Sequence, residues 1–261
     1  MAISSVVALI WIASPAAYAS KGQFHVSCAF SHAATDDPIV FPGQPGAGHL
    51  HDFFGNTSTN AFSTYGSMRR ARTTCDFSGD TSGYWTPALM KPNGHVVTPL
   101  HMTAYYYSGP GSAVRTPPKN FRMIAGGDTN DLQTAGYACG GGNPTSRVPM
   151  NCPSSWLKGV IVFPSCWDGV HTDSSDHRSH VTYPADMGCP PGFPVQIPKI
   201  VVHITYGIHD GRGYTLSSDD MMGMTHGMSL HADFWNTWNQ SALHMEVTNC
   251  LNAGLNCAPG T

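Results

Sequence analysis

The sequence predicts a mainly β fold, sandwich-like or jelly-roll-like, with one long C-terminal helix and long disulfide-tied loops. Three observations lead to this prediction. Only 11% of the residues are charged, which is less than half the usual share for a soluble domain. The chain contains 28 glycines and 20 prolines, which favour turns over long helices. Short apolar segments recur along the chain, and the longest helical pattern lies near its end.

The beginning of the chain is typical of a signal peptide. An apolar run at residues 6–12 precedes Ala-Tyr-Ala at residues 17–19, which has the small-x-small form of a cleavage site. No Lys or Arg comes before Lys21, so the usual positive n-region is missing. A membrane anchor is the rival interpretation, but the run is short and Ser, Pro and Ala interrupt it. We expect a signal peptide over residues 1–19 and a single secreted domain over residues 20–261.

Apolar segments bounded by turn-forming residues predict the strands. They cover residues 24–31, 84–90, 95–107, 121–124, 157–163, 195–206 and 214–217. The second and third segments are separated by Asn93-Gly94, which is a strong hairpin signal. A short helix is expected over residues 63–71, capped by Ser63 or Thr64.

The long helix is predicted from Ala232 to Leu251. Its apolar residues approximate one helical stripe: Phe234, Trp238, Ala242, Met245 and Val247. His231 and Asp233 would then lie at the first turn, where the helix dipole and free backbone N–H groups favour an anion.

Eight cysteines in an exported chain imply disulfides. None of them forms a C-x-x-C pair, which argues against a cysteine-based zinc knuckle. A loop rich in Gly and Pro is expected over residues 134–153, tied by two of the cysteines. Each bridge would add roughly 2–4 kcal/mol by constraining the unfolded chain. Proximity along the chain favours four local pairs: Cys28–Cys75, Cys139–Cys152, Cys166–Cys189 and Cys250–Cys257.

Histidine and aspartate are concentrated in three short stretches, the first of which contains His49, His51 and Asp52. In a strand, residues two apart point to the same face, so the H-x-H pair can present two ring nitrogens to one ion. This arrangement suits zinc or copper. Asp52 would face the other way or orient one imidazole. The alternative is that one histidine caps a loop and the other packs against Phe53 and Phe54.

The second stretch contains Asp176, His177 and His180, with spacing that suits a helical turn or a tight loop. The alternative is a capped polar loop, because Asp and Ser are common in turns. In the third stretch, His231 and Asp233 precede several aromatic residues. Such a group is typical of a small-ligand pocket, and aromatic faces also stack on sugar rings.

Several classes of function lack their sequence signals. The net charge is −3 and the lysines and arginines are scattered, which argues against nucleic-acid binding. No G-x-S-x-G, H-E-x-x-H or Gly-rich phosphate loop occurs. Since Glu246 is the single glutamate, paired-carboxylate glycoside hydrolysis would depend on aspartates. The methionines at residues 221–228 suit Cu(I), but such clusters more often serve flexible packing.

Taken together, these motifs resemble a secreted bacterial and fungal family, domain-of-unknown-function number nineteen ninety-six. The resemblance extends from about Phe24 to Cys250 and rests on residues 48–56, 73–75, 84–89, 163–169, 176–184 and 231–238. Members in fungi often accompany carbohydrate-binding modules of the cell wall. Residues 170–175, Thr237 and Asn239 depart from the usual pattern. The resemblance implies export and a shared fold, and it assigns no reaction.

We therefore expect a secreted, monomeric protein with a His/Asp-lined pocket, a metal-assisted hydrolase or related enzyme on extracellular polysaccharide. The expected cofactor is Zn or Cu, and neither nucleic acid nor a membrane is an expected partner of the mature chain. The alternatives are a non-catalytic cell-wall glycan-binding module and a copper- or zinc-binding protein. The expected metal ligands are His49, His51 and His180. The expected catalytic residues are Asp168, Asp176, His177, His231 and Asp233.

Overall fold

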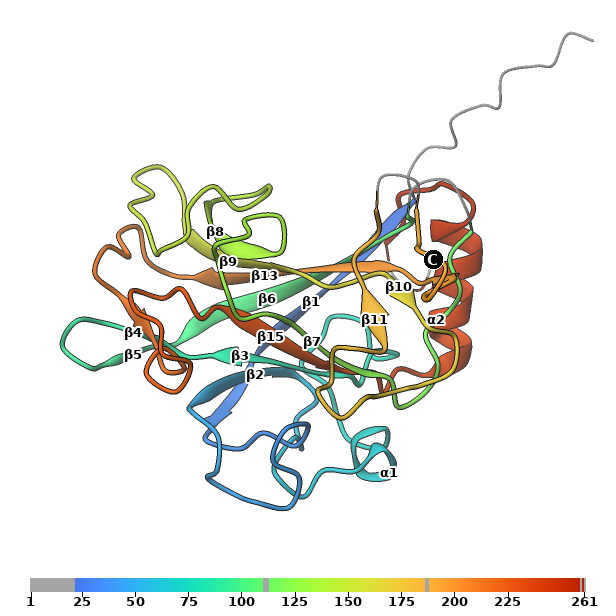
Figure 1. Ribbon diagram of the computed structural model, residues 1–261, viewed down its shortest axis with the longest axis horizontal. Helices are drawn as coiled ribbons and strands as arrows, with labels where there is room; N and C mark the ends of the chain where they lie inside the picture. Colours follow the sequence, from blue (N-terminus) through green and yellow to red (C-terminus); the bar gives the residue numbers. More distant parts are fainter. Residues whose placement is uncertain (1–21, 110–112, 186–187, 259, 261) are drawn as a thin grey trace, which may run out of the picture.

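The computed structural model describes residues 22–109, 113–185, 188–258 and 260. The predicted signal peptide lies outside the described residues. Nine strands form one antiparallel sheet in the order β7-β15-β3-β2-β1-β6-β13-β9-β8 (Figure 1). Their bounds are β1 (Gln23–Ala34), β2 (His51–Gly55), β3 (Gly83–Pro87), β6 (Pro99–Tyr107), β7 (Arg122–Gly126), β8 (Ala135–Cys139), β9 (Leu157–Val162), β13 (Lys199–Tyr206) and β15 (His231–Trp235). The prediction of a mainly β fold is confirmed.

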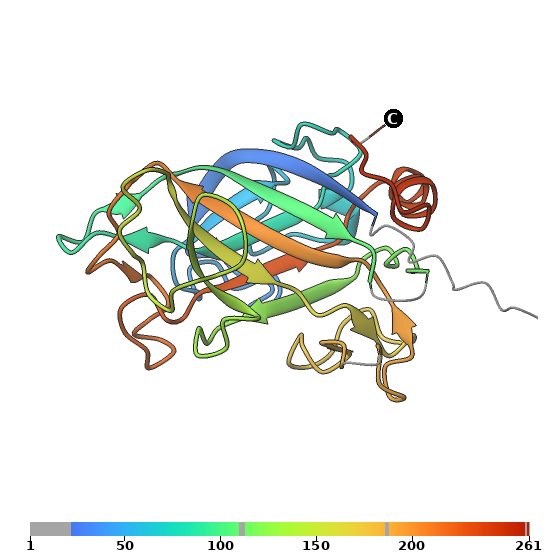
Figure 2. The same ribbon diagram turned by 90° about the horizontal axis from the view of Figure 1, so that it is seen from above.

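The long strand β1 joins the two halves of this sheet. Its first part pairs with β6, and its last part pairs with β2 after an irregularity between Phe30 and His32. The sheet curls so far that β7 also contacts β9, which encloses the main core between the two halves (Figure 2). Large side chains from both halves fill this core, including Phe24, Tyr84 and Tyr206.

Two small three-stranded sheets extend the loops. One has the order β11-β10-β12 and contains β10 (Cys166–Trp167), β11 (Val181–Thr182) and β12 (Val195–Gln196). The other has the order β14-β4-β5 and contains β4 (Leu89–Met90), β5 (Val96–Val97) and β14 (Thr215–Leu216). The turn between β4 and β5 confirms the predicted hairpin, because Gly94 adopts a φ of 80° and its N–H donates to the Lys91 carbonyl.

The predicted long C-terminal helix is wrong. Residues His231–Trp235 form β15, which pairs with β3 on one side and β7 on the other. Because these pairings use the backbone groups, residues 231 and 233 cannot lie in a helical turn. The helix α2 (Gln240–Glu246) and the π-helix η1 (Val247–Leu251) follow, and Asn239 caps α2 by accepting from two backbone N–H groups. Among the described residues, no helix is long and apolar enough to cross a membrane.

Two shorter elements also test predictions made from the sequence. The predicted helix at residues 63–71 forms as α1 (Tyr65–Met68), where Thr64 and Ser67 make a reciprocal capping box. By contrast, β8 lies in the segment expected to be a loop. It forms because Tyr137 is buried and its hydroxyl donates to the Gly227 carbonyl, which fixes this segment beside β9.

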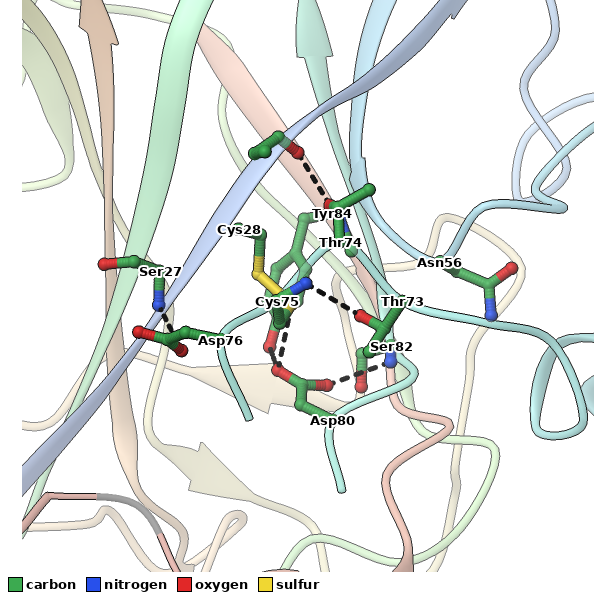
Figure 3. The surroundings of a disulfide bond; sticks show 12 residues. Ser27, Cys28, Asn56, Thr73, Thr74, Cys75, Asp76, Asp80, Ser82 and Tyr84 are labelled. Carbon is green, nitrogen blue, oxygen red and sulfur yellow. Dashed lines mark hydrogen bonds between the residues drawn. A yellow bond between two sulfur atoms is a disulfide. The ribbon is translucent and has the colours of Figure 1, made fainter. Parts of the chain in front are cut away.

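All four predicted disulfides are present, and they pair all eight cysteines. Cys28–Cys75 ties β1 to the segment that precedes β3 (Figure 3). These two sulfur atoms lie near the carboxylate of Asp80, a grouping that would suit a metal ion if the cysteines were free. Because the sulfurs are bonded to each other, the grouping is a structural bridge.

Asp80 belongs to a buried chain of hydrogen bonds (Figure 3). One oxygen accepts from the Ser82 N–H at 2.9 Å, and the other accepts from the Tyr84 hydroxyl at 2.7 Å. The Tyr84 hydroxyl lies 2.6 Å from the Tyr106 hydroxyl, which accepts from Nε1 of Trp238 at 3.1 Å. Every member of this chain has a partner, although burial still raises the pKa of Asp80 to about 7.

Candidate metal centre

The site lies on the outer face of β2, β3, β15 and β7, the half of the sheet that contains two of the histidine motifs (Figure 1). Alternation along β2 puts His51 and Phe53 on this face and Asp52 on the face toward the core. Asp233 of β15 and Phe53 of β2 both lie opposite Trp85 of β3. The three side chains therefore share one face of the sheet.

The same register explains how His51 and His231 come together. His51 lies opposite Pro87 at the end of β3. Asp233 lies opposite Trp85 and the strands are antiparallel, so His231, two residues before Asp233, lies at the level of Pro87. His51 and His231 therefore flank Pro87 from the two strands on either side of β3. His49 precedes β2 and turns its ring toward both: its centroid lies 4.0 Å from that of His51 and 5.1 Å from that of His231.

One ring nitrogen from each of these histidines lies within 4.8 Å of the other two. Nδ1 of His51 lies 3.0 Å from the Asp36 carbonyl, and Nδ1 of His231 lies 2.8 Å from the Ser229 carbonyl. A carbonyl can only accept, so each Nδ1 carries the proton and each Nε2 keeps its lone pair. This is the arrangement in which metal-ligating histidines are usually held.

The three imidazoles are neutral near pH 7. Burial lowers the pKa of His49 to about 4 and that of His231 to about 3. Burial also holds the pKa of His51 well below its usual range, and the neighbouring His49 and His231 lower it further. The Nε2 atoms of His49 and His51 are buried and have no hydrogen-bond partner among the described residues. Nε2 of His51 is therefore available as a ligand without first losing a proton, and the neutral His49 ring also offers one lone pair.

Asp233 supplies a carboxylate beside the histidines. Its Oδ2 lies 4.0 Å from Nε2 of His231, and neither oxygen has a hydrogen-bond partner among the described residues. Burial and then the charge of Asp37 raise its pKa well above the usual range, whereas Arg178 opposes this change. Asp37 is itself buried and accepts from the N–H groups of Ile39 and Val40. The site therefore holds a carboxyl group suited to exchanging a proton.

A pocket of about 360 Å³ opens above these groups. Arg178 forms part of its wall, and Nη1 of Arg178 donates to the carbonyls of Ile124 and Gly126 on β7. The pocket is lined by Asp37, Val40, Phe41, His49, Ile124, Ser175, Asp176, His177, Arg178, Met221, Met222, His231 and Asp233. A larger hollow of about 460 Å³ beside α2 has no histidine or carboxylate in its lining.

The structure does not bring every predicted site residue into this pocket. His180 has partners on both ring nitrogens, Ser174 Oγ at 2.9 Å and the Arg122 carbonyl at 2.8 Å. It is therefore not available as a ligand in this arrangement. Asp168 lies outside the pocket and closes a turn, where it accepts from Nδ1 and the backbone N–H of His171.

Asp176 and His177 reach the rim of the pocket. The backbone N–H of Ser179, with further hydrogen bonds from Ser174 and Arg178, holds the pKa of Asp176 well below its usual range. This side chain therefore stays ionised and fixes the turn. Nδ1 of His177 lies 2.7 Å from Asp173 Oδ1, so this histidine is held by a carboxylate at the rim of the pocket.

Sequence reasoning missed Asp37 and the two carbonyl groups that orient the histidines. Asp37 stands in a Pro/Gly-rich loop, and no spacing links it to Asp233. Backbone carbonyls carry no sequence signal at all. Arg178 lies within the second histidine stretch, and its guanidinium binds the carbonyls at the edge of β7.

Comparison with known proteins gives a family and no close relative. A family model described as "Domain of unknown function (DUF1996)" matches residues 37–238, which include all three histidines and Asp233. No curated protein and no solved structure matches the chain.

Proposed function

Because this chain belongs to the DUF1996 family, whose description names no reaction, we propose a function from the site itself. We propose that the protein is a secreted, metal-dependent hydrolase that acts on extracellular polysaccharide. His49, His51 and His231 hold the metal, and Asp233 transfers the proton. The four disulfides support export, because such bridges persist in oxidising compartments.

The observation that carries the proposal is the set of three imidazole nitrogens gathered within 4.8 Å. Catalytic zinc sites commonly use three protein ligands and leave the fourth position to water or substrate. Zn–N bonds of about 2.0–2.1 Å place ligand atoms roughly 3.3 Å apart, so the rings close slightly around the ion. The neighbouring pocket gives access to the fourth position.

The donor set determines which bond is attacked. A bound zinc ion supplies a hydroxide near neutral pH and polarises a carbonyl oxygen. This chemistry suits an ester or amide substituent on a sugar better than an acetal carbon, which has no carbonyl. Asp233 accepts the proton of the attacking water and returns it to the leaving alcohol or amine as the acyl bond breaks. Arg178 adds positive charge where the carbonyl oxygen becomes negative.

The experiment uses protein purified without a histidine tag. We expect one zinc per chain by elemental analysis, and release of acetate from acylated polysaccharides that stops when the metal is removed. His51→Ala and His231→Ala should each lose the metal and the activity. His95→Ala is the matched control, because His95 is an exposed histidine in the β4–β5 hairpin. Absence of stoichiometric metal, together with no product from any polysaccharide, would refute the proposal.

A second candidate function is copper binding, and a specific observation favours it. Met221 and Met222 line the same pocket as His49 and His231, and thioether sulfur suits Cu(I). Calorimetric titration with Cu(I) and Zn²⁺ separates the two functions. For a copper protein, Met221→Leu with Met222→Leu should weaken Cu(I) binding and leave Zn²⁺ binding unchanged.

A further inference from the structure

A second surface of the protein lies on the outer face of β1, β6, β13 and β9, which we call the basic face. Figure 2 shows these strands side by side, with β2, β3 and β15 behind them. The four strands and the adjacent β8 contain no Asp or Glu. Their outward positions carry two cationic lysines, Lys158 and Lys199, and three histidines, His25, His101 and His203.

The strand register arranges these groups in rows. Lys158, Thr205 and His101 form one row across β9, β13 and β6. Nε2 of His101 lies 3.2 Å from the Thr205 hydroxyl. His203 stands in the next row, opposite Thr103. One end of the face therefore presents the partly exposed Lys158 ammonium group beside the partly exposed His101 ring, and an ammonium group can bind a carboxylate.

Aromatic rings occupy the other end of the face. Tyr105 and Tyr107 are stacked, with centroids 6.2 Å apart and an interplanar angle of 16°. His25 lies 5.5 Å from Tyr105 on one side, and the ammonium group of Lys199 lies 5.1 Å from the Tyr107 ring. Both tyrosines are partly exposed and rest on a small apolar cluster outside the main core. Ring faces held in this way can stack on sugar rings.

The basic end contains polar groups with no partner in the described part of the chain. His203 is only 7% exposed, and its Nδ1 has no hydrogen bond. Its ring lies 5.1 Å from Tyr105, so it joins the basic rows to the aromatic end. Lys158 makes no ion pair with any described residue, and its charge lowers the pKa of His101 and of His203 in addition to the effect of burial. Asp76 accepts from the Ser27 N–H at the margin of the face.

We propose that the basic face binds an acidic polysaccharide, with its carboxylates at Lys158 and its sugar rings on Tyr105 and Tyr107. Charge complementarity favours an anion, and the tyrosine pair favours a sugar over a simple salt. Two lysines and a net charge of −3 are too little for a dense polyanion such as nucleic acid. None of the residues that line the metal pocket lies on this face, so the two sites are separate.

The test measures binding of polygalacturonate by affinity electrophoresis and calorimetry, with dextran as the neutral chain. Wild-type protein should bind polygalacturonate and not dextran, and binding should weaken as salt screens the charges. Tyr105→Ala and Lys158→Gln should each weaken binding about tenfold, which is typical for loss of one stacked ring or one ionic contact. Tyr105→Phe should retain binding. Lys91→Gln changes an exposed lysine in the β4–β5 hairpin and should have no effect.

Equal binding of dextran, or full binding by Lys158→Gln and Tyr105→Ala, would overturn the proposal. Tighter binding to anionic vesicles or duplex DNA than to polygalacturonate would also overturn it. His51→Ala should bind polygalacturonate as well as wild type does, with or without chelator. Failure of the proposed metal centre and failure of this second site are therefore distinguishable.

Discussion

Asp80→Asn tests whether the buried polar chain behind Cys28–Cys75 controls the pH dependence of stability. The change keeps the size of the side chain. Its oxygen still accepts from Ser82, and its amide can donate to the Tyr84 hydroxyl once that hydroxyl turns toward Tyr106. This reversal of the hydrogen bonds changes the unfolding free energy by the same amount at every pH. Removal of the titrating carboxyl group instead changes how the unfolding free energy depends on pH.

The size of the expected change in unfolding free energy follows from the pKa of Asp80. Burial raises the pKa of Asp80 from 3.8 to about 7 in the native state. This difference is about three pKa units, which corresponds to roughly 4 kcal/mol. Because the native state holds the proton more tightly, Asp80 contributes stability below about pH 4 and loses that contribution as the pH rises to about 7. Asp80→Asn has no titrating group at this position, so it does not lose this contribution to stability as the pH rises.

We therefore expect the unfolding free energy of Asp80→Asn, relative to wild type, to increase by roughly 4 kcal/mol between pH 4 and pH 7. Urea unfolding followed by tryptophan fluorescence, with the disulfides intact, measures it at several pH values. Asp220→Asn is the matched control, because Asp220 is an exposed carboxylate outside this chain of hydrogen bonds, and it should follow the wild-type profile. Parallel profiles for wild type and Asp80→Asn would refute the reasoning.

Three further predictions concern the site, one disulfide and one helix cap. Asp233→Asn should raise the unfolding free energy of metal-free protein at pH 8, because it removes a buried carboxyl group that has no hydrogen-bond partner among the described residues. If the proposed hydrolysis occurs, the same change should lower its rate at least about 100-fold, and a more active or less stable variant would contradict this. Replacing both Cys28 and Cys75 by serine should lower the free energy of unfolding, measured in urea, by about 4 kcal/mol, because the bridge closes a loop of 47 residues. A loss below about 1 kcal/mol would show that this loop is already constrained in the unfolded chain. Asn239→Ala should lower the thermal midpoint through loss of about 1 kcal/mol, and Asn239→Asp should not.

Several strands and all four disulfides were predictable because they depend on neighbours along the chain, whereas β2, β8 and β15 were not predicted as strands. Residues 24–31 and 157–163 alternate or stay apolar, and they form β1 and β9 near the expected bounds. The four bridges join cysteines that are adjacent in sequence order. The helix over residues 232–251 failed because a period of 2 and a period of 3.6 both fit its apolar positions. Long-range pairing of β15 with β3 and β7 decided the outcome.

The candidate site was predictable only as a set of motifs. His49 and His51 form an H-x-H pair, and this spacing predicts that they act as metal ligands. Their distance to His231 depends on strand order, since β3 has to lie between β2 and β15 for the rows to align. His180 shows the limit of this reasoning, because its motif looks equally suited to metal and both its nitrogens are hydrogen-bonded elsewhere.

The buried polar groups around Asp80 and those around the three histidines differ in whether they have hydrogen-bond partners. Around Asp80 every donor and acceptor has a partner, whereas the lone pairs of His49 and His51 and both oxygens of Asp233 have none among the described residues. Burying such groups without partners is unfavourable by about 1–3 kcal/mol each. Several water molecules fit in a pocket of about 360 Å³, so hydration of these groups is the alternative to a bound metal ion. A divalent cation held by the proposed ligands would accept the imidazole lone pairs, and water bound to that ion would have protons to donate to the carboxylate.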